Sequence, residues 1–120
     1  MKQRSRKAVV KQLDKVFGDF IKLRDRNTCV VCGARRNIQC GHLYTRASYS
    51  TRWDEENCWA QCAGCNLIHE HRPKHMEYAV AGRGIDVDKL FTKHCRVKKY
   101  TTADLEEMIL YYKNKLADAT

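Results

Sequence analysis

Hydrophobic residues recur at helical spacing near the start of the chain and again near its end. From about Lys7 to Arg24 they fall on one face, which predicts an amphipathic helix against a core: Val9, Val10, Leu13, Val16, Phe17, Phe20 and Ile21. A second stripe follows Thr101 and Thr102, either of which can cap a helix. That stripe consists of Leu105, Met108, Ile109, Tyr112 and Leu116.

The middle of the chain has shorter patterns. Residues 28–42 suggest a turn that holds cysteines and then a short hairpin, residues 44–53 are polar and predict a loop, and residues 54–61 return to the core. Further short helices are predicted over residues 65–71, 74–81 and 86–93, the last with Val87, Leu90 and Phe91 inward. Trp53 and Trp59 are interpreted as packing residues rather than base-stacking ones.

Seven cysteines stand out in this pattern. Two Cys-x-x-Cys pairs, Cys29 with Cys32 and Cys62 with Cys65, have the spacing of a closed tetrahedral zinc site. The alternatives are a redox-active pair and a disulfide framework, and the odd cysteine count argues against full pairing. Outside the pairs, Cys58 and Cys95 are predicted to be small buried residues, while Cys40 could share a strand face with His42.

Charge and hydropathy narrow the class of protein. The chain has 23 Lys and Arg against 14 Asp and Glu, a net charge of +9, which suits a polyanion such as nucleic acid. The alternative is a basic soluble protein without such a partner. There is no apolar run of about 18 residues, and the basic N-terminal segment is amphipathic rather than a secretory signal. We therefore expect a cytoplasmic protein without a membrane partner.

Between the cysteine pairs lie residues suited to phosphodiester hydrolysis, which needs a base and a divalent metal. His42 is the candidate base, Asn57 could hold the loop that presents it, and Asn66 could offer an amide oxygen to Mg²⁺ or Mn²⁺. The alternatives are a core or surface histidine, a turn asparagine and a helix cap. His69 or Glu70 would share a helix face with Asn66 and could complete the metal site, although a solvated surface role is the alternative for each.

Two arginines are candidate DNA-binding residues. Arg46 and Arg52 lie in the polar segment after His42 and could bind the phosphates that flank a cleavage site.

Taken together, these motifs resemble the phage NinG (Rap) recombination endonucleases, a branch of the HNH (ββα-metal) nucleases. The resemblance rests on residues 20–26, Cys29-x-x-Cys32-Gly33, Gly41-His42, residues 52–57, Gln61-Cys62-x-x-Cys65-Asn66 and residues 112–116. It implies metal-dependent cleavage of branched DNA such as Holliday junctions or D-loops, with His42 as base, Asn57 as the central asparagine and Asn66 as the third motif residue.

The chain departs from that family at two places. Many HNH enzymes have a metal-binding Asp before the catalytic His, where this chain has Gly41, so a second metal ligand is unassigned. The family also tends to show a Lys and a Gly-Asn after the Cys-Asn, where this chain has His69-Glu70-His71-Arg72.

The sequence thus predicts a single HNH-like nuclease domain over residues 1–120, of α+β class and mostly helical. A basic amphipathic helix (1–25) would precede a zinc-clamped ββα core (28–73) and a helical C-terminal part (74–120). The expected function is a phage endonuclease with structural Zn²⁺ and catalytic Mg²⁺ or Mn²⁺, in a phage-infected or prophage-bearing bacterial cell. A homodimer is the candidate assembly. The rivals are a non-catalytic zinc-stapled DNA-binding module and a general or sequence-specific HNH nuclease.

Overall fold

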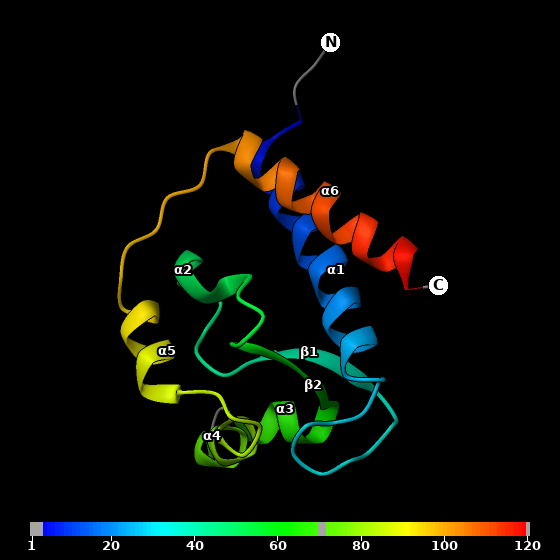
Figure 1. The fold of residues 1–120 in the computed structure, drawn as a ribbon, viewed down its shortest axis with the longest axis vertical. Coiled ribbons are helices and arrows are strands. Elements are labelled where there is room, and N and C mark those ends of the chain that lie inside the picture. The colour runs from blue at the N-terminus through cyan, green and yellow to red at the C-terminus, as the bar shows by residue number, and fades with distance from the viewer. Residues whose placement is uncertain (1–3, 70–71, 120) are drawn as a thin grey trace.

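A computed structural model of the chain describes residues 4–69 and 72–119. Helices and a small sheet alternate along these residues (Figure 1). The elements are α1 (Arg6–Arg24), β1 (Ile38–His42), α2 (Tyr49–Arg52), β2 (Cys58–Cys62), α3 (Ala63–His69), α4 (Lys74–Ala81), α5 (Val87–His94) and α6 (Thr102–Asp118). The domain is of mixed α/β class and mostly helical, as the sequence predicts.

Helices α1 and α6 lie side by side and form a helical pair at one side of the molecule (Figure 1). The Ser5 hydroxyl accepts a hydrogen bond from the Ala8 N–H at the start of α1. Thr101 begins α6 in a capping box, in which its hydroxyl accepts from the Asp104 N–H and the Asp104 carboxylate accepts from the Thr101 N–H. Local spacing and caps therefore define both helices, and both predictions are confirmed.

Strand β1 pairs with β2 in antiparallel register, from Ile38 opposite Cys62 to His42 opposite Cys58. The prediction of a short hairpin within residues 28–42 is therefore wrong. That segment supplies one strand, and the partner strand comes from residues beyond the polar segment. The polar segment itself is not only a loop, because residues 49–52 form the single turn α2. Pairing between distant segments is a tertiary property that local patterns do not encode.

Helix α1 covers the sheet and fixes its position. At the end of α1, the Arg24 guanidinium donates to the carbonyls of Glu55 and Cys58, at 2.7 and 2.8 Å. The Asp25 carboxylate accepts a hydrogen bond of 2.8 Å from the Ala60 N–H. Helix α3 contacts both strands as well. Two strands alone would be only marginally stable. Contacts with α1 and α3 therefore stabilise this sheet.

Buried apolar residues form two clusters. The first, here called the helical cluster, joins α1 and α6 with part of the sheet region: Val9, Leu13, Val16, Phe17, Ile21, Trp53, Cys58, Leu105, Ile109 and Tyr112. The second, here called the clamp-side cluster, consists of Val30, Leu43, Trp59, Met76, Val80 and Leu90. Each cluster contains one of the two tryptophans, so the prediction that both are packing residues is confirmed.

The structure corrects two predictions about burial near α5. Leu90 is buried as predicted, but Phe91 is 51% exposed, because its ring packs edge-on against Tyr44, with centroids 5.3 Å apart, and does not enter the buried cluster that contains Leu90. Cys95 is also exposed rather than buried, whereas Cys58 is fully buried as predicted. None of the helices in the described residues is both long and apolar enough to cross a lipid bilayer.

Candidate metal centre and candidate active site

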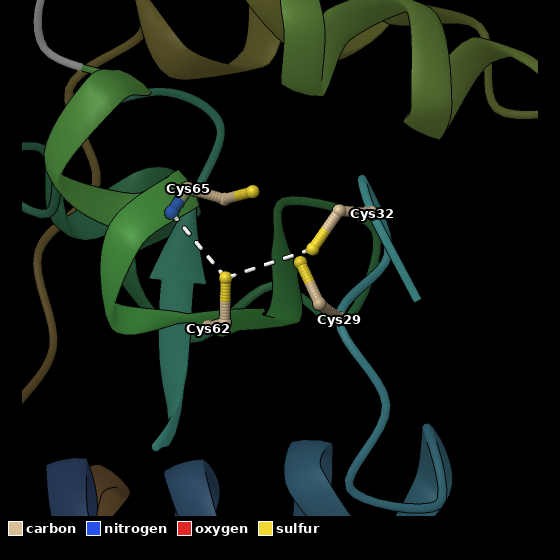
Figure 2. Close-up of side chains that lie close together, drawn as sticks. All are labelled: Cys29, Cys32, Cys62 and Cys65. Carbon is tan, nitrogen blue, oxygen red and sulfur yellow. Dashed lines mark hydrogen bonds between the residues drawn. The ribbon is translucent and has the colours of Figure 1, made fainter. Parts of the chain in front are cut away.

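The four paired cysteines converge at one end of the sheet (Figure 2). The sulfur atoms of Cys29, Cys32, Cys62 and Cys65 all lie within 4.8 Å of one another. The Cys32 and Cys62 Sγ atoms are 3.7 Å apart, and the Cys65 N–H donates to the Cys62 Sγ at 3.4 Å. Four thiols from two Cys-x-x-Cys pairs are the donor set of a closed structural zinc site. This cluster, here called the clamp, can hold a zinc ion.

Local backbone geometry places the first cysteine pair. Gly33 has φ +77°, a left-handed conformation that favours glycine, so the chain turns back directly after Cys32. Hydrogen bonds from the Gly33 N–H to the Cys29 carbonyl and from the Cys29 N–H to the Ala34 carbonyl close this turn. The Val30 N–H donates to the Ala60 carbonyl at 2.8 Å, which fastens the turn to β2.

The clamp thiols differ in their readiness to ionise. Burial raises the pKa of Cys29, but backbone N–H groups near Cys32, Cys62 and Val31 outweigh it and bring that pKa to about 7. Burial and the surrounding thiols raise the pKa of Cys65. The Cys29 thiolate is thus favoured, whereas the Cys65 thiolate is opposed, chiefly by burial. A divalent cation bound by the four sulfur atoms would favour their thiolate forms.

His42 ends β1, at the opposite end of the sheet from the clamp. Its Nε2 lies 2.9 Å from the Arg52 carbonyl oxygen. A carbonyl only accepts hydrogen bonds, so Nε2 carries the proton and Nδ1 of the neutral ring has a lone pair. Burial lowers the pKa of His42 from its ordinary value, although the Arg52 carbonyl and Asp14 favour the charged form. The ring is therefore neutral at neutral pH, as a general base requires.

The position before His42 has room only for glycine. A Cβ at this position would lie 1.8 Å from the Gln61 side-chain oxygen and 3.2 Å from the Asn66 side-chain oxygen. The backbone of β1 thus passes close beneath two side chains from β2 and α3. Any residue larger than glycine at position 41 would therefore displace the side chain of Gln61 and press against that of Asn66.

Asn57 is fully buried and fastens the loop that follows His42. Its side-chain oxygen accepts from the Tyr44 N–H at 2.8 Å, and its amide donates to the carbonyls of Tyr44 and Thr51. The Leu43 N–H also donates to the Asn57 carbonyl. Asn57 lies in a turn, and its buried amide also bonds the backbone of the loop after His42, so its predicted role in positioning His42 stays a prediction.

A cavity of about 560 Å³ opens beside His42 and is lined by Cys40, His42, Thr45, Arg46, Asn66 and His69. The Asn66 amide donates to the Gln39 side-chain oxygen at 2.8 Å. Asn66 is the fourth residue of α3, so it does not cap that helix. The His69 Nε2 lies 2.9 Å from the Leu43 carbonyl, which by the same argument leaves a lone pair on Nδ1, and this buried Nδ1 has no hydrogen-bond partner among the described residues.

The two candidate phosphate-binding arginines have different surroundings. Arg46 is exposed and lines the cavity. Arg52 forms two hydrogen bonds with the Asp14 carboxylate, at 3.0 and 2.6 Å, and its side chain is only 15% exposed. Much of the Arg52 guanidinium is therefore occupied, which makes Arg46 the better placed of the two. Glu70, the other candidate metal ligand, lies outside the described residues.

Several residues near His42 were not predicted from the sequence to belong to the site. Asp14 lies 38 positions before Arg52, and no local signal links them. Thr45 lines the cavity without belonging to a motif. Cys40, His42 and Cys58 bring their ligand atoms within 4.8 Å of one another. Only the two-residue spacing of Cys40 and His42 hinted at this cluster.

The fold and these sites define a small mixed α/β domain with a cysteine cluster able to hold zinc and a separate cavity lined by histidine and asparagine. A family model described as "Bacteriophage Lambda NinG protein" matches residues 1–120. The chain therefore belongs to the phage NinG family.

Curated relatives agree with this assignment. The chain is 30% identical over 118 residues to Protein ninG of Salmonella phage P22, covering 91% of this chain and 56% of the relative. It is also 30% identical over 118 residues to Protein ninG of Escherichia phage 933W, covering 91% of this chain and 57% of that protein. The chain thus spans a little over half the length of these relatives. No solved structure matches it.

Proposed function

We propose that this chain is a metal-dependent DNA endonuclease of the HNH (ββα-metal) class, in its His-Asn-Asn variant. The observation that supports this best is the cavity, in which a neutral histidine, an asparagine, a second histidine and an exposed arginine meet. The order of β1, β2 and α3 along the chain supports a ββα core. The clamp would hold that core together with a structural zinc ion.

In the proposed reaction, His42 is the general base. Its Nδ1 lone pair takes a proton from water, while the water oxygen attacks phosphorus and the bond to the leaving oxygen breaks. The Arg52 carbonyl holds the ring by its Nε2 proton, which fixes the tautomer that leaves Nδ1 basic. Asn57 supports this geometry through the loop after His42.

The residues beside His42 suit a divalent ion. An amide oxygen from Asn66 fits Mg²⁺ or Mn²⁺, which prefer oxygen ligands. The buried Nδ1 of His69 has no hydrogen-bond partner among the described residues and stays a candidate further ligand. When bound, the ion would stabilise negative charge on the phosphate and on the leaving oxygen. Glu70 stays a candidate ligand from the sequence alone.

We propose branched recombination intermediates, such as Holliday junctions or D-loops, as the preferred substrate. A net charge of +9 supports binding to phosphates, and exposed Arg46 at the cavity supplies a contact close to the proposed chemistry. No helix-turn-helix is evident in the part of the chain that the structure describes, and we propose that discrimination depends on DNA shape rather than base edges. A homodimer would match the near two-fold symmetry of a four-way junction.

The test is cleavage of a four-way junction and of a linear duplex of the same sequence, at fixed salt, with Mg²⁺, Mn²⁺ or EDTA. We expect metal-dependent cleavage that favours the junction. His42→Ala should abolish cleavage and leave DNA affinity nearly unchanged, because affinity comes from Lys and Arg residues. His75→Ala is the matched control, since His75 is exposed and does not line the cavity of His42.

Each outcome of this assay selects one function. Cleavage by His42→Ala at the wild-type rate would exclude His42 as base, and DNA binding without any cleavage would favour the non-catalytic zinc-stapled module. Equal cleavage of both substrates would indicate a general nuclease. For the metal, Asn66→Ala should raise the Mg²⁺ or Mn²⁺ concentration needed for half-maximal rate, whereas an unchanged titration would remove Asn66 from the metal site.

A further inference from the structure

Cys40 and Cys58 have no part in the reaction proposed above, but together with His42 they form a second cluster of possible metal ligands. Cys40 and His42 lie two residues apart on β1, so their side chains share one face of the sheet, and Cys58 lies opposite His42 on β2. Their ligand atoms lie within 4.8 Å of one another, the same limit that the clamp satisfies. All three residues are in the described part of the chain, and neither thiol forms a disulfide.

The surroundings hold these side chains together. The Arg52 carbonyl accepts a hydrogen bond from the His42 Nε2 at 2.9 Å and lies 3.5 Å from the Cys58 Sγ, which donates to it. Helix α1 covers Cys40, where a Cβ added to Gly18 would lie 3.4 Å from the Cys40 Cβ. Cys40 and His42 also line the cavity, so an ion can reach the cluster from solvent.

We infer that Cys40, His42 and Cys58 form a second metal site, selective for a thiophilic divalent cation such as Zn²⁺, that holds the proposed catalytic base inactive when occupied. Two sulfurs and one imidazole nitrogen suit Zn²⁺ and not Mg²⁺, which prefers oxygen ligands. Three protein ligands leave a fourth position, which a water molecule from the cavity can fill.

Metal binding at this site would disable His42 through either ring nitrogen. Coordination through Nδ1 would take the lone pair that accepts the proton from water. Coordination through Nε2 would break the hydrogen bond to the Arg52 carbonyl and remove the tautomer that makes Nδ1 basic. Both thiols lose their protons as the metal–sulfur bonds form, so two protons are released for each ion bound.

The second site should be weaker than the clamp. It supplies two thiolates where the clamp supplies four, and Cys58 is a fully buried thiol whose proton the metal must displace. The sites are also separate. Cys62 and Cys58 lie at opposite ends of β2, about 13 Å apart at roughly 3.3 Å per residue. Metal should therefore fill the clamp first and this site afterwards.

Cobalt provides a test that does not depend on nuclease activity. Metal-free protein is titrated with Co²⁺ under reducing conditions, and thiolate-to-cobalt absorption is followed. Wild type should bind two Co²⁺ per chain in two resolved steps, and Cys40→Ser should bind one. The matched control is Cys95→Ser, which removes an exposed cysteine outside both clusters and should still bind two. A wild type that stops at one ion, or a Cys40→Ser variant that still binds two, would overturn the proposal.

Because Cys40 is only partly buried, its variant is expected to fold, and circular dichroism checks this. Cys58→Ser is the second variant and should also lose the weaker step.

The inhibitory consequence rests on the proposed nuclease function and has its own readout. With Mg²⁺ present, added Zn²⁺ should inhibit wild-type cleavage. Loss of an outer-shell partner alone costs about 10- to 100-fold in metal affinity, so Cys40→Ser should need at least about tenfold more Zn²⁺ for half inhibition. Equal Zn²⁺ sensitivity would overturn the inhibitory role, whereas absence of any cleavage together with two bound Co²⁺ would count against the nuclease proposal and not against the site.

Discussion

The two apolar clusters are stabilised in different ways. The helical cluster has ten buried residues, joins two long capped helices and contains no member of the clamp. The clamp-side cluster has six buried residues and draws on short elements and loops, with the clamp beside it. We therefore expect the helical pair to be stable by its own packing, and the region around the clamp to depend on a bound zinc ion for its stability.

The largest expected effect is loss of the clamp. Cys29→Ser should lower the free energy of unfolding by several kcal/mol, because the binding energy of a structural metal contributes directly to folding. The zinc content of the purified protein should also fall. Cys95→Ser is the control and should change neither. Trp53 lies in the helical cluster and Trp59 in the clamp-side cluster, so fluorescence of Trp53→Phe and Trp59→Phe backgrounds reports each region separately.

In Cys29→Ser, the emission of Trp59 should shift toward that of an exposed tryptophan, while Trp53 keeps most of its buried signal. If both tryptophans respond alike, the two clusters unfold as one unit and the comparison fails.

A second, smaller effect is expected from the helical cluster. Phe17 is buried and its ring packs edge-on against Tyr112, with centroids 4.9 Å apart. Phe17→Ala should lower the free energy of unfolding by about 3–5 kcal/mol in urea denaturation, without changing zinc content. Phe91→Ala is the matched control. Because the Phe91 ring is 51% exposed, this variant should lose far less of the free energy of unfolding than Phe17→Ala. Similar losses in both variants would show that Phe17 is not central to this cluster.

The smallest effect concerns the capping box of α6. Hydrogen bonds from Thr101 lower the pKa of Asp104 below its ordinary 3.8. A carboxyl with a depressed folded pKa contributes stability that is complete above 3.8 and disappears as pH falls through the lower folded value. Asp104→Asn should therefore be less stable than wild type near neutral pH, and the difference should shrink in strong acid.

Thermal unfolding at a series of pH values measures this difference, with Asp118→Asn at the other end of α6 as control. A difference that stays constant from neutral pH to strong acid would exclude ionisation of Asp104 as its cause.

How far the sequence predicts this molecule depends on the range of each interaction. Helices α1 and α6 follow from local spacing and from caps at Ser5 and Thr101, so their positions were predictable. The partner strand of β1 was not, because pairing between residues 38–42 and 58–62 depends on contacts far apart in the sequence. The exposure of Phe91 and Cys95 likewise depends on which neighbours cover them.

The same distinction applies to the candidate site. The four clamp cysteines were predictable from spacing, and the motif singled out His42, Asn57 and Asn66. The bond between Arg52 and Asp14 was not predictable, and it changes how much of Arg52 is available to a phosphate. The convergence of Cys40 with Cys58 required the strand register.

The side chains at the end of α1 have a consequence for solubility. Along the outer edge of β2, the Ala60 N–H is taken by Asp25, the Ala60 carbonyl by the Val30 N–H and the Cys58 carbonyl by Arg24. An exposed strand edge is a template for pairing with another chain and for aggregation. Here three of the backbone groups that a foreign strand would need are already bonded within the molecule. Addition of a strand beyond β2 would have to break these bonds, so the end of α1 and the turn at Val30 both oppose an intermolecular sheet at this edge.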